Sequence, residues 1–97
     1  MMYAVLLRAE LRLPACHSLK EKRAVLRPVL DGLRHRHHLS VAEVDHHDTW
    51  QRSAVGWAVV GADAAHVDTV ADATERFVWS FPEIEVLSVE RFWPELD

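Results

Sequence analysis

The chain has 97 residues, 49% of them hydrophobic, which is enough for one domain with its own core and too few for two. Its single cysteine, Cys16, excludes an intramolecular disulfide, and the apolar run near the start ends at Arg8, too early for a signal peptide or a membrane span. We therefore expect one cytoplasmic domain over residues 1–97.

The net charge of −4 is unevenly divided along the chain. Residues 1–40 carry eight Lys and Arg against three acidic residues, and residues 41–97 carry three against twelve. The overall charge argues against bulk nucleic-acid binding, but the basic first half leaves room for a local basic site. The alternative is that opposite charges neutralise each other between neighbouring elements.

The first two elements are a strand and a helix. Residues 3–13 alternate between apolar and charged side chains, which predicts a strand with one solvent-exposed face. Ser18 and Glu21 have the spacing of a capping box at the start of an amphipathic helix. Pro28 lies inside this helix and lacks an amide donor, so we expect a kink near residues 24–27.

Two further strands are predicted in the middle of the chain. Residues 39–45 and 52–61 are rich in β-branched and small side chains. The polar residues 46–51 between them form a hairpin connection, whose turn we place at residues 48–49.

A second helix and a last strand complete the pattern. Asp63 is a candidate cap. The predicted core face of this helix has helical spacing and consists of Val67, Val70, Ala71, Thr74, Phe77 and Val78. Residues 84–92 form the last strand. The order β-α-β-β-α-β predicts an α+β, ferredoxin-like split βαβ fold, in which two helices cover one face of a four-stranded antiparallel sheet.

The sheet face away from the helices must be solvated or bound to a partner. In residues 52–61 small side chains alternate with Val55, Trp57 and Val59. Because small side chains suit close packing beneath helices, we predict that these three lie on the open face. There they favour a homodimer or a stacking platform for RNA bases. The alternative is an inverted register with Trp57 in the core.

The segment 43–48 is a candidate metal site. Along a strand, two carboxylates and an imidazole would share one face, and such mixed ligands suit Mn, Fe or Zn. The candidate ligands are Glu43, Asp45, His46, His47 and Asp48. An Asp can instead orient His46 for acid–base work, or Asp45 and Asp48 can simply cap the turn.

A basic cluster runs along the first predicted helix. The start of this helix exposes amides and the positive end of the helix dipole, which together favour phosphate. The candidate nucleic-acid or anion contacts are Ser18, Lys20, Lys22, Arg23 and Arg27, with Gln51 and Arg52 from the hairpin. The alternative is a solvated helix face.

Catalytic motifs do not emerge from the sequence. The serines fall in strand, cap or turn contexts, and the three glycines are too widely spaced for a phosphate-binding loop. We assign no catalytic residue and expect no cofactor. The sequence leaves enzymatic activity open and favours a non-enzymatic role.

Two polar blocks carry a family resemblance. They are residues 17–23 and residues 42–52, and the second contains the pattern D-H-x-D-x-W-Q-R. Over residues 3–93 the chain resembles the bacterial YlxP-like family, a resemblance that implies the same ferredoxin-like fold. Genes of that family tend to lie near genes for translation initiation and ribosome maturation.

The resemblance and the basic first half together make an RNA- or ribosome-associated accessory factor the leading hypothesis. The first alternative is a homodimeric protein-interaction module that uses the open sheet face, and a metal-binding protein comes third. Whether the two polar blocks meet in space stays open.

Overall fold

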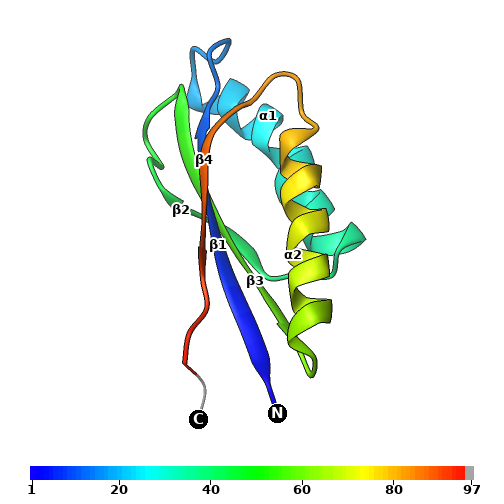
Figure 1. Cartoon of the computed structure of the whole chain (residues 1–97). Helices are drawn as coiled ribbons and strands as arrows, with labels where there is room; N and C mark the ends of the chain where they lie inside the picture. The colour runs from blue at the N-terminus through cyan, green and yellow to red at the C-terminus, as the bar shows by residue number, and fades with distance from the viewer. Residues whose placement is uncertain (96–97) are drawn as a thin grey trace.

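The computed structural model describes residues 1–95 as a sheet covered on one side by two helices (Figure 1). The elements are β1 (Tyr3–Arg12), α1 (Leu19–Asp31), the π-helical turn η1 (Gly32–Arg36), β2 (Val41–Asp45), β3 (Arg52–Gly61), α2 (Ala64–Trp79) and β4 (Glu85–Phe92). All strand pairs are antiparallel and the strand order is β2-β3-β1-β4. This arrangement confirms the predicted ferredoxin-like fold. Within the described part of the chain, no helix has the length and apolar character needed to cross a membrane.

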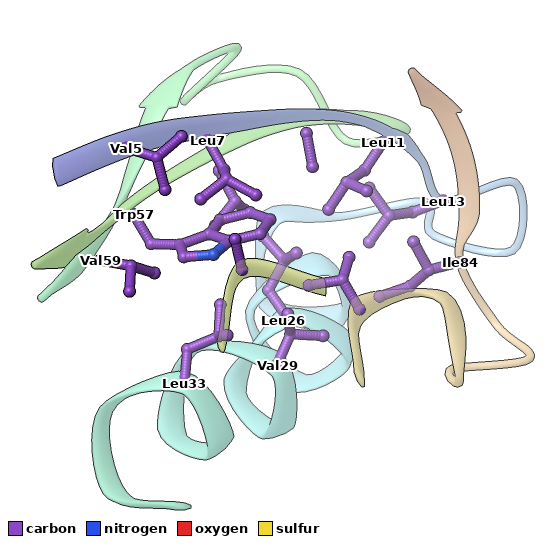
Figure 2. Packing of buried hydrophobic residues seen from close by; sticks show 14 of the residues in the cluster. Val5, Leu7, Leu11, Leu13, Leu26, Val29, Leu33, Trp57, Val59 and Ile84 are labelled. Atoms are coloured by element: carbon purple, nitrogen blue, oxygen red, sulfur yellow. The ribbon is translucent and has the colours of Figure 1, made fainter. Parts of the chain in front are cut away.

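The core lies between the sheet and the helices. The odd-numbered residues from Val5 to Leu11 of β1 are buried, and among them Leu7 and Ala9 pair in register with Trp57 and Val55 of β3. Figure 2 shows the side chains of β1 and β3 reaching towards Leu26, Val29 and Leu33. Strand pairing places directly opposed residues on the same sheet face, so the inward face of β1 fixes the inward face of β3.

The prediction that Val55, Trp57 and Val59 lie on the open face is wrong. Trp57 is only 3% exposed, and Val55 and Val59 are also buried. The Trp57 indole N–H donates to the Thr74 hydroxyl at 2.9 Å, which satisfies its one polar group beneath α2. Large side chains are needed to fill the space under two helices, so the small residues of β3 face the open side instead.

The start of α1 follows the sequence pattern, and the helix continues past its internal proline. The Ser18 hydroxyl accepts a hydrogen bond from the Glu21 amide at 3.1 Å, as predicted for the cap. The chain stays α-helical through Pro28 to Asp31, including the residues where we expected a kink. The change in helical type comes one turn later, at η1.

The caps and turns position the remaining elements. Asp63 accepts from the Ala65 amide at 3.0 Å, which confirms the predicted cap of α2. In the β2–β3 loop the Thr49 amide donates to the His46 carbonyl at 3.1 Å. The tight turn is therefore centred on residues 47–48, one residue earlier than predicted. Its first residue, His46, has a left-handed backbone with φ 61°, which is unusual for a residue other than glycine.

Candidate functional site

Lys22 joins the two polar blocks of the sequence. Its side chain is 3% exposed and reaches from α1 to the β2–β3 loop. The ammonium donates to the carbonyls of His46 at 2.6 Å and Thr49 at 2.8 Å, and it lies 2.9 Å from the Glu43 carboxylate. The open question about the blocks is thus answered, because α1 and the loop are in direct contact.

This geometry removes Lys22 from the candidate ligand contacts. An ammonium group has three donors, and the two carbonyls and the carboxylate engage all of them. Burying a charge costs several kcal/mol unless it is paired and hydrogen-bonded, so the full set of partners is what makes its burial tolerable. Lys22 therefore fixes the loop and cannot bind a phosphate in this position.

The Glu43 carboxylate has two partners within the fold, one on α1 and one on β3. Besides Lys22, its carboxylate accepts from the buried Ser53 hydroxyl at 2.6 Å. The Lys22–Glu43–Ser53 chain links α1, β2 and β3. Glu43 thus completes a buried polar network and does not face a shared ligand site with Asp45.

A β-bulge separates the candidate metal ligands. The register of β2 with β3 shifts between Glu43 and Asp45, so these two side chains do not share a face as simple alternation predicted. Asp45 lies 3.4 Å from Arg8 on the open sheet face, whereas Glu43 points towards α1.

The remaining candidate ligands are divided in the same way. The His46 ring lies with Asp45 on the open side, and His47 and Asp48 line a groove beside α1. Across residues 1–95, no group of three His, Cys, Asp or Glu side chains is arranged to hold a metal ion. Glu43, Asp45 and His47 therefore do not share one face as strand alternation predicted, because the bulge changes the direction of the side chains that follow it.

Glu10 is the centre of a charged cluster on the open sheet face. Its carboxylate accepts from Arg8 at 2.8 Å and Arg52 at 3.0 Å, and it lies 3.2 Å from Nε2 of His46. The hydrogen bond from Arg8 is the largest cause of a lowered pKa for the Glu10 carboxyl. Both arginines of the cluster are paired with carboxylates, so its charges largely neutralise one another.

The two hairpin residues predicted as contacts are held by different partners. Arg52 is held by Glu10 on the sheet face opposite α1. Gln51 donates from its side chain to the Pro14 carbonyl at 3.4 Å. Arg52 is therefore on the opposite side of the sheet from α1, which carries Arg23 and Arg27, while Gln51 is held at the end of the β2–β3 loop.

A groove of about 380 Å³ lies between α1 and the edge strand β2. Leu19, Leu26 and Leu30 provide its apolar lining, and Glu43, His47 and Asp48 contribute from the β2 side. The basic residues of the groove are Arg23, Arg27 and Arg34, in addition to the paired Lys22. Because Lys22 and Glu43 cancel, the arginines dominate the remaining charge, opposed by Asp31 and Asp48.

The arginines differ in their internal contacts. Arg34 donates to the Val41 carbonyl at 3.3 Å and lies 4.0 Å from Asp31. Among the described residues, neither Arg23 nor Arg27 has an acidic side chain within ion-pair distance, and both are exposed. Their guanidinium groups are therefore available to an anion.

Arg34 was missing from the predicted contacts. The sequence does contain a signal for it, because positions 23, 27 and 34 follow one side of a helix with spacings of four and seven. Ser18 and Lys20 were predicted as contacts but do not line the groove. The Ser18 hydroxyl is already used as the helix cap.

The topology and the groove define a small ferredoxin-like α+β protein with a basic groove beside its edge strand. A family model described as "Protein of unknown function (DUF503)" matches residues 5–91, and the chain belongs to this family. It is 37% identical over 76 residues to the "Uncharacterized protein YlxP" of Bacillus subtilis (strain 168), covering 78% of this chain and 83% of that protein.

Solved structures show the same fold at low sequence identity. The de novo designed protein Foldit4 is 11% identical, with a TM-score of 0.56, and the match covers 98% of this chain and all of that one. A hydantoinase/carbamoylase family amidase from Burkholderia ambifaria is also 11% identical, with a TM-score of 0.52. That match covers 95% of this chain and only 28% of the amidase, so the likeness concerns a part of the enzyme and its fold alone.

Proposed function

We propose that the protein is a cytoplasmic RNA-binding accessory factor, which holds RNA phosphates in the groove between α1 and β2. The observation that carries this proposal is the pair of exposed guanidinium groups of Arg23 and Arg27, which have no acidic partner within residues 1–95. Planar guanidinium groups match phosphate oxygens in a forked geometry. The gene neighbourhood implied by the YlxP-like resemblance favours an RNA of the translation apparatus.

The distribution of charge supports binding at this face and not elsewhere. On the other side of the helical layer, α2 carries Asp68, Asp72 and Glu75, which surround Arg91 of β4 at 3.1, 2.7 and 3.5 Å. Three carboxylates around one guanidinium leave excess negative charge, which repels RNA. Since screening limits exposed charges to about 8–10 Å at physiological salt, the local arginines outweigh the net charge of −4 at the groove.

Anisotropy of a fluorescently labelled single-stranded oligoribonucleotide, titrated at several salt concentrations, tests the proposal. The double variant Arg23→Glu/Arg27→Glu should bind at least tenfold more weakly. Its plot of log affinity against log salt should be flatter by roughly 1.4, the value for two phosphate contacts on a single strand. Thermal stability should change little, because both side chains are exposed.

The matched control is Arg12→Glu/Arg76→Glu, which makes the same change in net charge away from the groove. It should keep the affinity within about threefold, in line with a contact that is local. If both double variants lowered the RNA affinity equally, net charge and not the groove would govern binding. Absence of binding by the natural sequence at low salt would end the RNA proposal.

A second candidate function, homodimerisation, is favoured by the open sheet face. Leu6, Val44, Val60 and Phe92 on this face each expose at least 47% of their surface. Leu6 pairs in register with Ala58 on one side and Phe92 on the other, so the apolar surface is continuous across three strands. It replaces the incorrectly predicted surface around Trp57.

The occupant we propose for this face is a second copy of the chain. The neighbouring charges of Arg8, Glu10, Asp45 and Arg52 are paired within the protomer, so two identical faces meet without net repulsion. The double variant Leu6→Glu/Phe92→Glu should then give monomers, while Trp79→Glu on α2 should not. Analytical ultracentrifugation at high micromolar concentration measures both, and a monomeric natural protein would exclude this candidate.

A further inference from the structure

We infer that the Trp50 indole stacks on an unpaired base, so that the RNA recognised at this site is single-stranded. The inference rests on the proposed RNA-binding function. Trp50 is 51% exposed, although tryptophan is a residue that folding normally buries to a large extent. It lies in the β2–β3 loop, which belongs to the second polar block of the sequence. Neither the metal hypothesis nor the arginine groove explains why this ring is exposed.

The backbone on both sides of Trp50 is held in place. The carbonyl of the preceding residue, Thr49, accepts from the buried Lys22 ammonium at 2.8 Å. The carbonyl of the following residue, Gln51, accepts from the Leu13 amide at 3.0 Å. An exposed ring on a fixed backbone loses little conformational freedom on binding, which is the property of a preorganised contact.

The surface of Trp50 continues the arginine groove. Residues 48–51 line a second, shallower hollow, and Asp48 lines both this hollow and the groove beside α1. Lys22, which holds the loop, directly precedes Arg23 in α1. The two hollows thus meet at Asp48, so the arginines and the indole ring belong to adjoining surfaces of the molecule.

The chemistry selects one class of RNA. In a duplex the bases are stacked and their faces are hidden, whereas single strands, loops and ends can place a base on an aromatic side chain. Every base has a π face, so one tryptophan gives affinity with little sequence preference. The arrangement of two phosphate-binding guanidinium groups and one ring thus fits single-stranded RNA of relaxed sequence.

The test compares Trp50→Ala with Trp79→Ala, since Trp79 is slightly more exposed, at 57%, but lies on α2. Each variant is titrated with a labelled single-stranded oligoribonucleotide, with the same strand in a duplex, and with an abasic oligomer of the same length. Trp50→Ala should weaken binding of the single strand about tenfold, the size of one stacking contact, and leave binding of the abasic oligomer unchanged. Trp79→Ala should change neither.

The possible results distinguish base stacking by Trp50 from RNA binding in the arginine groove. If Trp50→Ala binds the single strand as tightly as the natural sequence while Arg23→Glu/Arg27→Glu does not, stacking is excluded and the arginine groove stands. If the duplex binds as tightly as the single strand, the inference is wrong. A loss of affinity for the abasic oligomer would show that Trp50 acts on the loop and not on a base. No RNA binding by the natural sequence would overturn both.

Discussion

Lys22 is the residue on which the geometry of the site depends most. A lysine in a row of exposed basic residues is normally solvated, but here the chain has placed its ammonium under a loop and surrounded it with acceptors. The neighbouring Arg23 remains exposed at the groove. Two consecutive basic residues thus differ in their surroundings: Lys22 is buried and holds the loop, whereas Arg23 is exposed at the groove.

Replacing Lys22 with methionine should destabilise the fold. The carbonyls of His46 and Thr49 and the Glu43 carboxylate would lose their partner, and breaking such a buried pair costs about 3–5 kcal/mol. Urea unfolding measures the change. The control Lys20→Met, at an exposed position of the same helix, should stay within about 0.5 kcal/mol. A Lys22→Met protein as stable as the control would mean that the buried contacts contribute nothing net.

Glu10 makes folding stability depend on pH in the acid range. Its pKa is lowered in the folded protein, first by the hydrogen bond from Arg8, so the unfolded chain binds the proton more readily. The stabilisation is therefore present above the pKa of the unfolded chain, about 4.3, and is lost as the pH falls through the lower folded value.

The variant Glu10→Gln lacks this carboxylate. We expect it to be less stable than the natural protein at pH 7, with the difference shrinking as the pH falls towards 3. Thermal unfolding at a series of pH values measures both curves. A difference that is constant over this range would contradict the shifted pKa.

At the scale of the elements, the close approach of the two helices depends on Gly32. A Cβ added there would overlap the Phe77 ring of α2. The Phe77 ring in turn packs edge-on against Phe81, with centroids 5.1 Å apart, so it is not free to move aside. Gly32 has an ordinary helical backbone with φ −62°, so the constraint comes from space and not from backbone conformation.

Gly32→Ala should therefore be destabilising despite the better helix propensity of alanine. The gain of up to about 1 kcal/mol from propensity is outweighed by overpacking, which costs about 1–3 kcal/mol. Calorimetric unfolding of the single variant and of Gly32→Ala/Phe77→Leu measures the effect, and the smaller side chain should recover part of the loss. A stabilised Gly32→Ala protein would show that the helices can separate freely.

The elements and their order could be predicted from the sequence because their signals are local. Alternation gave β1 and β3, and the hydroxyl and carboxylate caps at Ser18 and Asp63 marked the helix starts. The inward face of β3 could not be predicted from alternation, since a period of two does not say which set points to the helices. The pairing with β1 decides which side chains of β3 face the helices, and it places Trp57 in the core.

The candidate site was only partly predictable for a similar reason. The stripe of Arg23 and Arg27 is visible in the helical spacing, whereas the burial of Lys22 depends on a loop more than twenty residues away. The bulge between Glu43 and Asp45 is an irregularity in strand pairing that the residue pattern does not display. The sequence pattern therefore does not determine contacts between distant segments or irregularities in strand pairing.

At the scale of the whole molecule, three surfaces have different chemistry. The α1 side presents arginines beside a groove, the α2 side presents carboxylates around Arg91, and the open sheet face combines apolar side chains with internally paired charges. The first suits an anion and the third suits another copy of the chain. The two proposed functions, RNA binding and dimerisation, would therefore use separate surfaces, and a dimer would leave both grooves available.

Binding of single-stranded RNA by Trp50 and the groove between α1 and β2 is the function that we propose for the protein. Chemical-shift mapping tests it most directly, with ¹⁵N-labelled protein titrated at low salt with an unlabelled oligoribonucleotide. We expect the largest shifts at the amides of Arg23, Arg27 and Arg34 and at the indole N–H of Trp50. Largest shifts around Leu6 and Phe92 on the open sheet face, or none anywhere, would contradict the claim.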